Sequence, residues 1–132
     1  MRKSALIAPV AAAAAMLLCA PAEAAPRMTG EEQLAKMLEG RVAGKPVDCI
    51  SVLDSHDMTV IDHTAIVFNA GSVIYVNRPR DASALDSDKI LVTKSSTDQL
   101  CNVDIVTLRD RTGFTYAGTV GLESFVPYTR VR

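Results

Sequence analysis

Hydrophobic residues beyond position 46 come in short runs separated by polar segments. The runs VDCISV, TVI, TAIVFN, SVIYVN, KILVTK and DIVTLRD lie between positions 47 and 110, and SFVPY follows at 124–128. Short runs rich in β-branched residues and bounded by turn-forming residues are typical of β-strands. The pattern predicts a mainly β domain (α+β) of about six strands in an antiparallel sheet, a small barrel or a sandwich.

Polar segments place the turns between these strands. Asp62-His63 separates the second and third runs, and Asn69–Ser72 separates the third and fourth, with a glycine that can adopt positive φ. In the polar connection 78–88, Pro79 argues against a central strand. The segment SSTDQLC is expected to be a loop that delivers a cysteine to the edge of the next strand.

One helix precedes the strands. Thr29 with Glu32 three residues later matches a capping box, and Gly40 can take the left-handed conformation that ends a helix. The apolar stripe consists of Leu34, Met37 and Leu38. So short a helix should be stable only when packed across one face or end of the sheet.

The first 24 residues have the three-part layout of a secretory signal peptide. Arg2 and Lys3 are followed by an uncharged apolar run, and Ala22-Glu23-Ala24 supplies the small residues of a cleavage site. We predict cleavage between Ala24 and Ala25, which leaves residues 25–132 as a single small β-rich domain in the periplasm or secreted.

Two alternatives to cleavage are disfavoured. An uncleaved anchor needs roughly 20 apolar residues, and this run is shorter and mostly alanine. A lipoprotein would be acylated at Cys19, but the residue before it, Leu18, is bulky. No stable membrane insertion is expected after cleavage.

The charge of the predicted mature chain disfavours two classes of partner. The signal carries two of the 14 basic and one of the 15 acidic residues, so the remainder has a net charge of −2. Nucleic-acid binding would need clustered excess lysine and arginine, and anionic lipid would need a polybasic segment.

Cleavage removes one of the three cysteines and leaves Cys49 and Cys101. Two cysteines in an oxidising compartment predict one disulfide, with free buried thiols or an intermolecular link as alternatives. Closing a loop of about 53 residues should stabilise the fold by roughly 4 kcal/mol.

Polar residues around Cys49 suggest two kinds of chemistry. A nucleophilic thiol with His56 as its base is disfavoured, because no helix N-terminus follows Cys49 to lower the thiol pKa. The metal-ligand candidates are His56, His63, Asp54, Asp57 and the neighbouring Asp62. If the histidines lie in turns at opposite ends of one strand, they cannot share an ion. We therefore assign no metal site, no cofactor and no catalytic residue.

Other motifs add little. The chain lacks G-x-S-x-G, Walker A and G-x-G-x-x-G, and nothing selects one carboxylate pair for glycosidase chemistry.

Paired arginines with one spacer residue form a candidate binding patch for an anionic component or a protein: Arg78, Arg80, Arg109 and Arg111. A solvated strand end with local ion pairs is the favoured alternative.

The segments DCISV, IDHTAIVF, YVNRPR and DQLCNVDIV resemble, in this order, a family of small exported bacterial proteins catalogued as a domain of unknown function. The likeness covers Val47 to Val126. Many members carry a further cysteine pair, where this chain has Ser83-Ala84-Leu85 and Gly118-Thr119-Val120. The resemblance implies an exported small β domain and transfers no functional residue.

We expect a non-enzymatic envelope-associated protein that binds an envelope protein or component, or has a structural role. The alternative is a small hydrolase or metal-dependent enzyme that uses His56 or His63.

Overall fold

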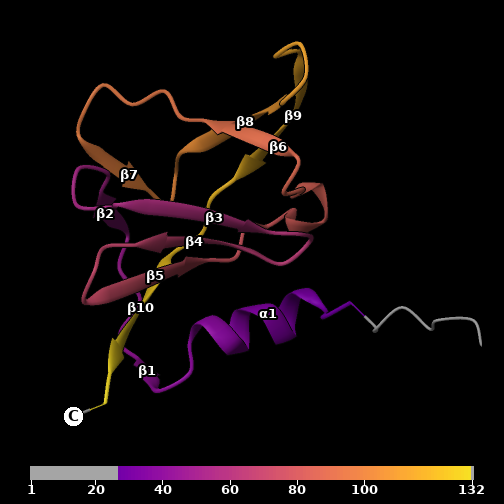
Figure 1. The fold of residues 1–132 in the computed structure, drawn as a ribbon. Helices are drawn as coiled ribbons and strands as arrows, with labels where there is room; N and C mark the ends of the chain where they lie inside the picture. Colours follow the sequence, from indigo (N-terminus) through magenta and orange to yellow (C-terminus); the bar gives the residue numbers. More distant parts are fainter. Residues whose placement is uncertain (1–26, 132) are drawn as a thin grey trace, which may run out of the picture.

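The computed structural model describes residues 27–131, so the predicted signal peptide and Cys19 lie outside the described residues (Figure 1). The elements in chain order are α1 (Gly30–Met37), β1 (Arg41–Ala43), β2 (Cys49–Ser51), β3 (Asp57–Ile61), β4 (Ala65–Asn69), β5 (Val73–Asn77), the 3₁₀ turn η1 (Ala82–Ala84), β6 (Lys89–Val92), β7 (Gln99–Cys101), β8 (Ile105–Asp110), β9 (Tyr116–Gly121) and β10 (Phe125–Arg130).

The strands form three antiparallel sheets within residues 27–131. Sheet A has the order β1-β10-β5-β4-β3, sheet B pairs β2 with β7, and sheet C has the order β6-β8-β9. These sheets do not close into a barrel. The predicted class, mainly β and antiparallel with one N-terminal helix, is confirmed.

All seven predicted runs are strands, and three further strands were not predicted. The expected loop 95–101 ends in β7, which pairs with β2. The glycine-containing segment 116–121 is β9, and β1 follows directly after the helix. The described residues therefore contain ten strands rather than about six.

The capping box of α1 is confirmed. The Thr29 hydroxyl accepts the Glu32 N–H at 3.2 Å, and the Glu32 carboxylate accepts the Thr29 N–H at 3.2 Å. Gly40 has φ +74°, as expected for the residue that reverses the chain. The apolar stripe is narrower than expected, because Leu34 is buried whereas Met37 is 37 % exposed.

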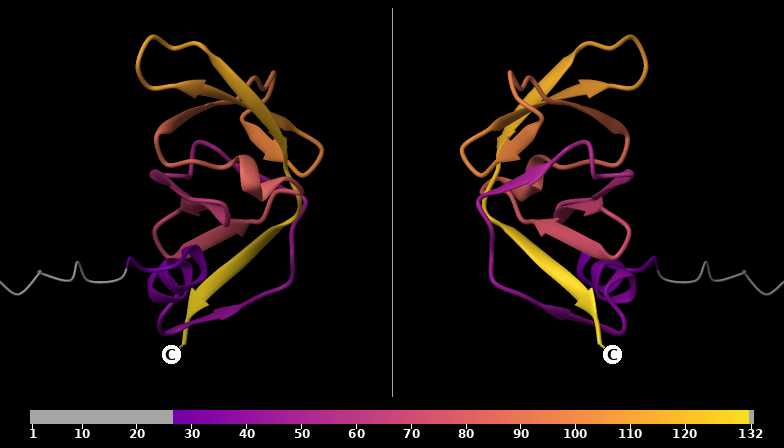
Figure 2. Two further views of the ribbon diagram at one scale, coloured as in Figure 1. Left: turned by 90° about the vertical axis from the view of Figure 1, so that its right-hand side faces the viewer. Right: turned by 90° about the vertical axis from the view of Figure 1, so that its left-hand side faces the viewer.

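Helix α1 covers one face of sheet A (Figures 1 and 2). The buried residues between them are Leu34, Ile61, Ala65, Val67, Ile74 and Val76. The approach is close at Gly30, where an added Cβ would lie 1.8 Å from the Thr64 hydroxyl oxygen. Glycine at this position lets the helix start against the β3–β4 turn.

The opposite face of sheet A packs against sheets B and C. This larger core consists of Ile50, Ile66, Phe68, Leu85, Leu100, Val106, Leu108, Val120, Leu122 and Phe125. Phe68 and Phe125 meet edge to face with ring centroids 5.7 Å apart. The molecule thus has a helix, a central sheet and an outer pair of sheets as its layers.

Between β9 and β10 the chain passes from sheet C to sheet A. Asn77 at the end of β5 is fully buried and holds this corner. Its amide donates to the Glu123 carbonyl at 2.6 Å and accepts the Glu123 N–H at 3.1 Å. The side chain thereby forms the pair of hydrogen bonds that a neighbouring strand would form.

The predicted turns are present. Gly71, in the β4–β5 turn, has φ +85°, and Pro79 is buried outside any strand. His63 has φ +56° in the three-residue turn between β3 and β4.

In residues 27–131 no helix has the length and apolar character needed to cross a membrane.

Candidate functional site

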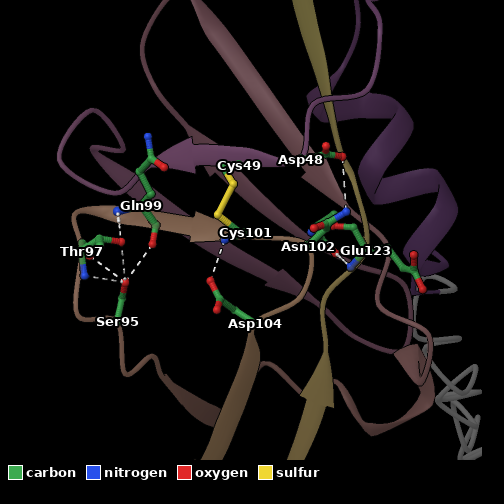
Figure 3. The surroundings of a disulfide bond; sticks show 10 residues. Asp48, Cys49, Ser95, Thr97, Gln99, Cys101, Asn102, Asp104 and Glu123 are labelled. Carbon is green, nitrogen blue, oxygen red and sulfur yellow. Dashed lines mark hydrogen bonds between the residues drawn. A yellow bond between two sulfur atoms is a disulfide. The ribbon is translucent and has the colours of Figure 1, made fainter.

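Cys49 and Cys101 form the predicted disulfide. They are directly opposite one another in the β2–β7 ladder, and both are half-buried (Figure 3). The Asp104 carboxylate accepts the Cys101 N–H at 2.7 Å, and the Asn102 N–H donates to the Asp48 carbonyl at 2.7 Å. The bridge and these hydrogen bonds fix sheet B, and the oxidised Cys49 offers no thiolate nucleophile.

The two histidines lie at opposite ends of β3. At this separation they cannot bind the same metal ion. His63 donates its Nδ1–H to the Ser83 carbonyl at 2.7 Å. The neighbouring Asp62 accepts the Ser87 N–H at 2.6 Å, and this hydrogen bond lowers the pKa of the Asp62 carboxyl. The Asp62-His63 turn therefore fastens the segment 82–87 to sheet A.

His56 is exposed, and its backbone N–H donates to the Asn69 carbonyl at 2.8 Å. Asp54 and His56 line one surface hollow, and His56 and Asp57 line a second one. Among residues 27–131, however, no three His, Cys, Asp or Glu side chains are grouped so as to hold a metal ion.

The paired arginines lie in two separate places. Arg78 forms a bidentate pair with Glu31 of α1 at 2.6 and 3.1 Å, and Arg80 pairs with Glu123 at 2.5 Å. The hydrogen bond from Arg78 lowers the pKa of the Glu31 carboxyl, but both side chains are exposed and the pair contributes little to stability.

Arg109 and Arg111 belong to the β8–β9 hairpin. Arg109 donates to the Phe114 carbonyl and lies over the Phe114 ring, 5.2 Å from its centroid. Arg111 donates to the Ser87 carbonyl at 3.1 Å. Because the hairpin and α1 are at opposite ends of the molecule (Figure 2), the four arginines do not form one surface.

A groove that the sequence did not indicate lies between two open sheet edges. Within the described residues β3 is hydrogen-bonded only to β4, and β6 only to β8. A hollow of about 360 Å³ lies between residues 58–60 of β3 and residues 89–91 of β6. A second hollow of about 310 Å³ adjoins it and shares Met58 and Leu91 with it.

The groove has an apolar centre with charged residues toward its ends. Met58, which is 40 % exposed, and Leu91 line both hollows. Lys89 and Arg111 are the charged residues that line the larger hollow, and Asp57 is the acidic residue that lines the smaller one.

The two cations have different local partners. Lys89 pairs with Asp110, which lowers the pKa of the Asp110 carboxyl and raises that of Lys89. Arg111 forms no ion pair within residues 27–131. The side chain of Arg111 is thus the cation available to an occupant of the groove.

No family model, no curated protein and no solved structure matches the chain. The resemblance to small exported bacterial proteins stays a prediction.

Proposed function

We propose that the mature chain is a non-enzymatic binding module of the bacterial envelope, periplasmic or secreted, that holds an extended segment of another envelope protein. The observation that carries the proposal is the groove between β3 and β6, with its apolar centre and two unpaired strand edges. Ligand sites of proteins are mostly apolar concave surfaces with a few polar groups that set orientation.

Two further features support this proposal. The disulfide is of the kind found in proteins that fold in oxidising compartments, in keeping with the predicted signal peptide. The polar side chains of the Asp62-His63 turn are used in hydrogen bonds that hold the fold together. They are therefore assigned a structural role.

Site-directed photo-crosslinking in intact cells tests the proposal. A benzophenone amino acid replaces Met58 in the groove, and a matched variant carries it in place of Met37 on α1. The two methionines are 40 % and 37 % exposed, so their access to random contacts is similar. We expect a discrete protein adduct from position 58 and none from position 37, with the chain recovered in the periplasmic fraction or the medium.

Equal adducts at the two positions, or none at position 58, would contradict the proposal. Stoichiometric zinc in the purified protein that is lost in His56→Ala would also contradict it and favour a metal-dependent enzyme. Thermal unfolding of each variant shows whether the replacement left the fold intact.

A further inference from the structure

We infer that the occupant of the groove binds as an added β-strand, antiparallel to β3, with an acidic residue near Arg111 and a basic residue near Asp57. This inference rests on the proposed function and specifies the chemistry of the partner. In this arrangement the partner's main-chain hydrogen bonds supply the affinity, and its two charged residues set the direction in which its strand runs.

Among residues 27–131, β3 forms one free edge of sheet A, where main-chain groups have no partner strand. Every second residue of an edge strand points its N–H and C=O away from the neighbouring strand, and these groups can pair with an incoming chain. The other free edge of sheet A is β1, which has three residues where β3 has five. β3 also borders the groove, so an added strand gains side-chain contacts there as well as hydrogen bonds.

The length of β3 sets the size of the occupant. Five residues at about 3.4 Å each span roughly 17 Å, so about five residues of the partner can pair with β3. Met58 and Val60 lie opposite Phe68 and Ile66 of β4 and are on the face that packs against sheet C. Since side chains alternate along a strand, every second side chain of the partner would point into the groove. These positions should be apolar.

The direction of the partner follows from the placement of the charges. Asp62, just after β3, accepts the Ser87 N–H, so the start of β6 lies beside the end of β3. Figure 1 shows β3 and β6 running in opposite directions. Arg111 is therefore near the end of β3, and Asp57 is the first residue of β3.

A strand antiparallel to β3 begins near Arg111 and ends near Asp57. Charge complementarity then favours an acidic residue on its N-terminal side and a basic residue on its C-terminal side. Lys89 and Arg111 also line a further hollow, which they share with Asp88, Asp110 and Thr112.

Three pools of acetylated, amidated heptapeptides serve as probes. The first pool has Asp at the first position, Lys at the last, and mixed Val, Ile, Leu and Thr between them. The second pool exchanges the charged residues, and the third is the first pool with alternate main-chain amides N-methylated. The readout is hydrogen exchange of the β3 amides in the oxidised protein, with the β1 amides as an internal control.

The first pool should slow exchange in β3 and leave β1 unchanged. Because two exposed ion pairs are exchanged for like-charge contacts, the second pool should bind roughly three- to tenfold more weakly. N-methylation should abolish the protection, since it removes the donors of the added strand. Arg111→Glu should bring the first two pools to similar affinity, because each pool then makes one opposite-charge and one like-charge contact.

Met58→Lys should weaken the first pool, whereas the matched Met37→Lys should not. Equal binding of the N-methylated pool would show that the groove binds side chains without strand addition. Absence of protection by any pool, or a preference for the exchanged charges, would also overturn the inference. The crosslinking result at position 58 does not depend on these peptide results. A specific adduct there together with no strand addition would overturn this inference and leave the proposed function supported.

Discussion

Removal of the buried Asn77 amide should destabilise the protein by about 2 kcal/mol, because two hydrogen bonds with a net value of about 1 kcal/mol each are lost. Both bonds go to the backbone of Glu123, at 2.6 and 3.1 Å, and Asn77 is fully buried. In Asn77→Ala the Glu123 N–H and carbonyl lose their hydrogen-bond partner on β5. If water does not replace that partner, the unsatisfied buried group destabilises the protein further.

Asn77→Asp makes the prediction sharper, because the shape is conserved. The introduced carboxylate can still accept the Glu123 N–H, but it faces the Glu123 carbonyl oxygen with no donor. We expect a loss of about 3 kcal/mol or more at neutral pH, since a buried charge is added. Burial raises the pKa of that carboxyl in the folded state, so the variant should recover stability as the pH falls and the group gains a donating proton.

Urea unfolding followed by circular dichroism measures both effects. With a slope of about 1.5 kcal/mol per molar urea, Asn77→Ala should lower the midpoint by a little over 1 M. Asn102→Ala is the control, since its side chain makes one exposed hydrogen bond of 3.3 Å to Asp48. If Asn77→Ala unfolds at the wild-type midpoint, or Asn77→Asp shows no recovery in acid, the assigned role of this amide is wrong.

Three other perturbations test the fold. Reducing the bridge, or replacing Cys49 and Cys101 by serine, removes the cross-link that closes a loop of 52 residues in the unfolded chain. The unfolded chain then gains entropy, so the free energy of unfolding should fall by about 4 kcal/mol. Equal urea midpoints with and without reductant would refute this. Gly30→Ala would favour an isolated helix, but its Cβ would lie 1.8 Å from a hydroxyl oxygen of the β3–β4 turn, so a lower thermal midpoint is expected and a higher one would contradict the close approach. The hydrogen bond from the Ser87 N–H lowers the pKa of Asp62 from its usual 3.8, so its stabilisation is present above that value and is lost as the pH falls through the lowered pKa. Asp62→Asn should therefore be less sensitive to acid below about pH 4 than the wild type in parallel urea titrations.

The strand runs could be predicted because their β-branched residues are dense, as in TAIVFN and SVIYVN. The three missed strands lack this signal. Sequences RVA and QLC are only three residues long, and YAGTVG contains two glycines. These segments become strands because β10, β2 and β8 lie beside them, which is a tertiary effect that local propensity does not contain.

The groove could not be predicted, because an edge strand is defined by the order of strands in space. The predicted run TVI did not include Asp57 and Met58, and nothing in DMTVI distinguishes an edge strand from a central one. Asn77 was similarly hidden, since an asparagine after an apolar run more often begins a turn. The disulfide was predictable because cleavage of the predicted signal leaves one pair of cysteines.

The place of β10 in sheet A has a consequence for the order of folding. β10 lies between β1 and β5, so the last strand of the described residues 27–131 joins their first strand to the rest of the sheet. These contacts span most of the sequence, and contacts of such high sequence separation slow folding. A nascent chain cannot complete sheet A until residues 125–130 have been synthesised, and a chain truncated before Phe125 would leave β1 with no strand to pair with.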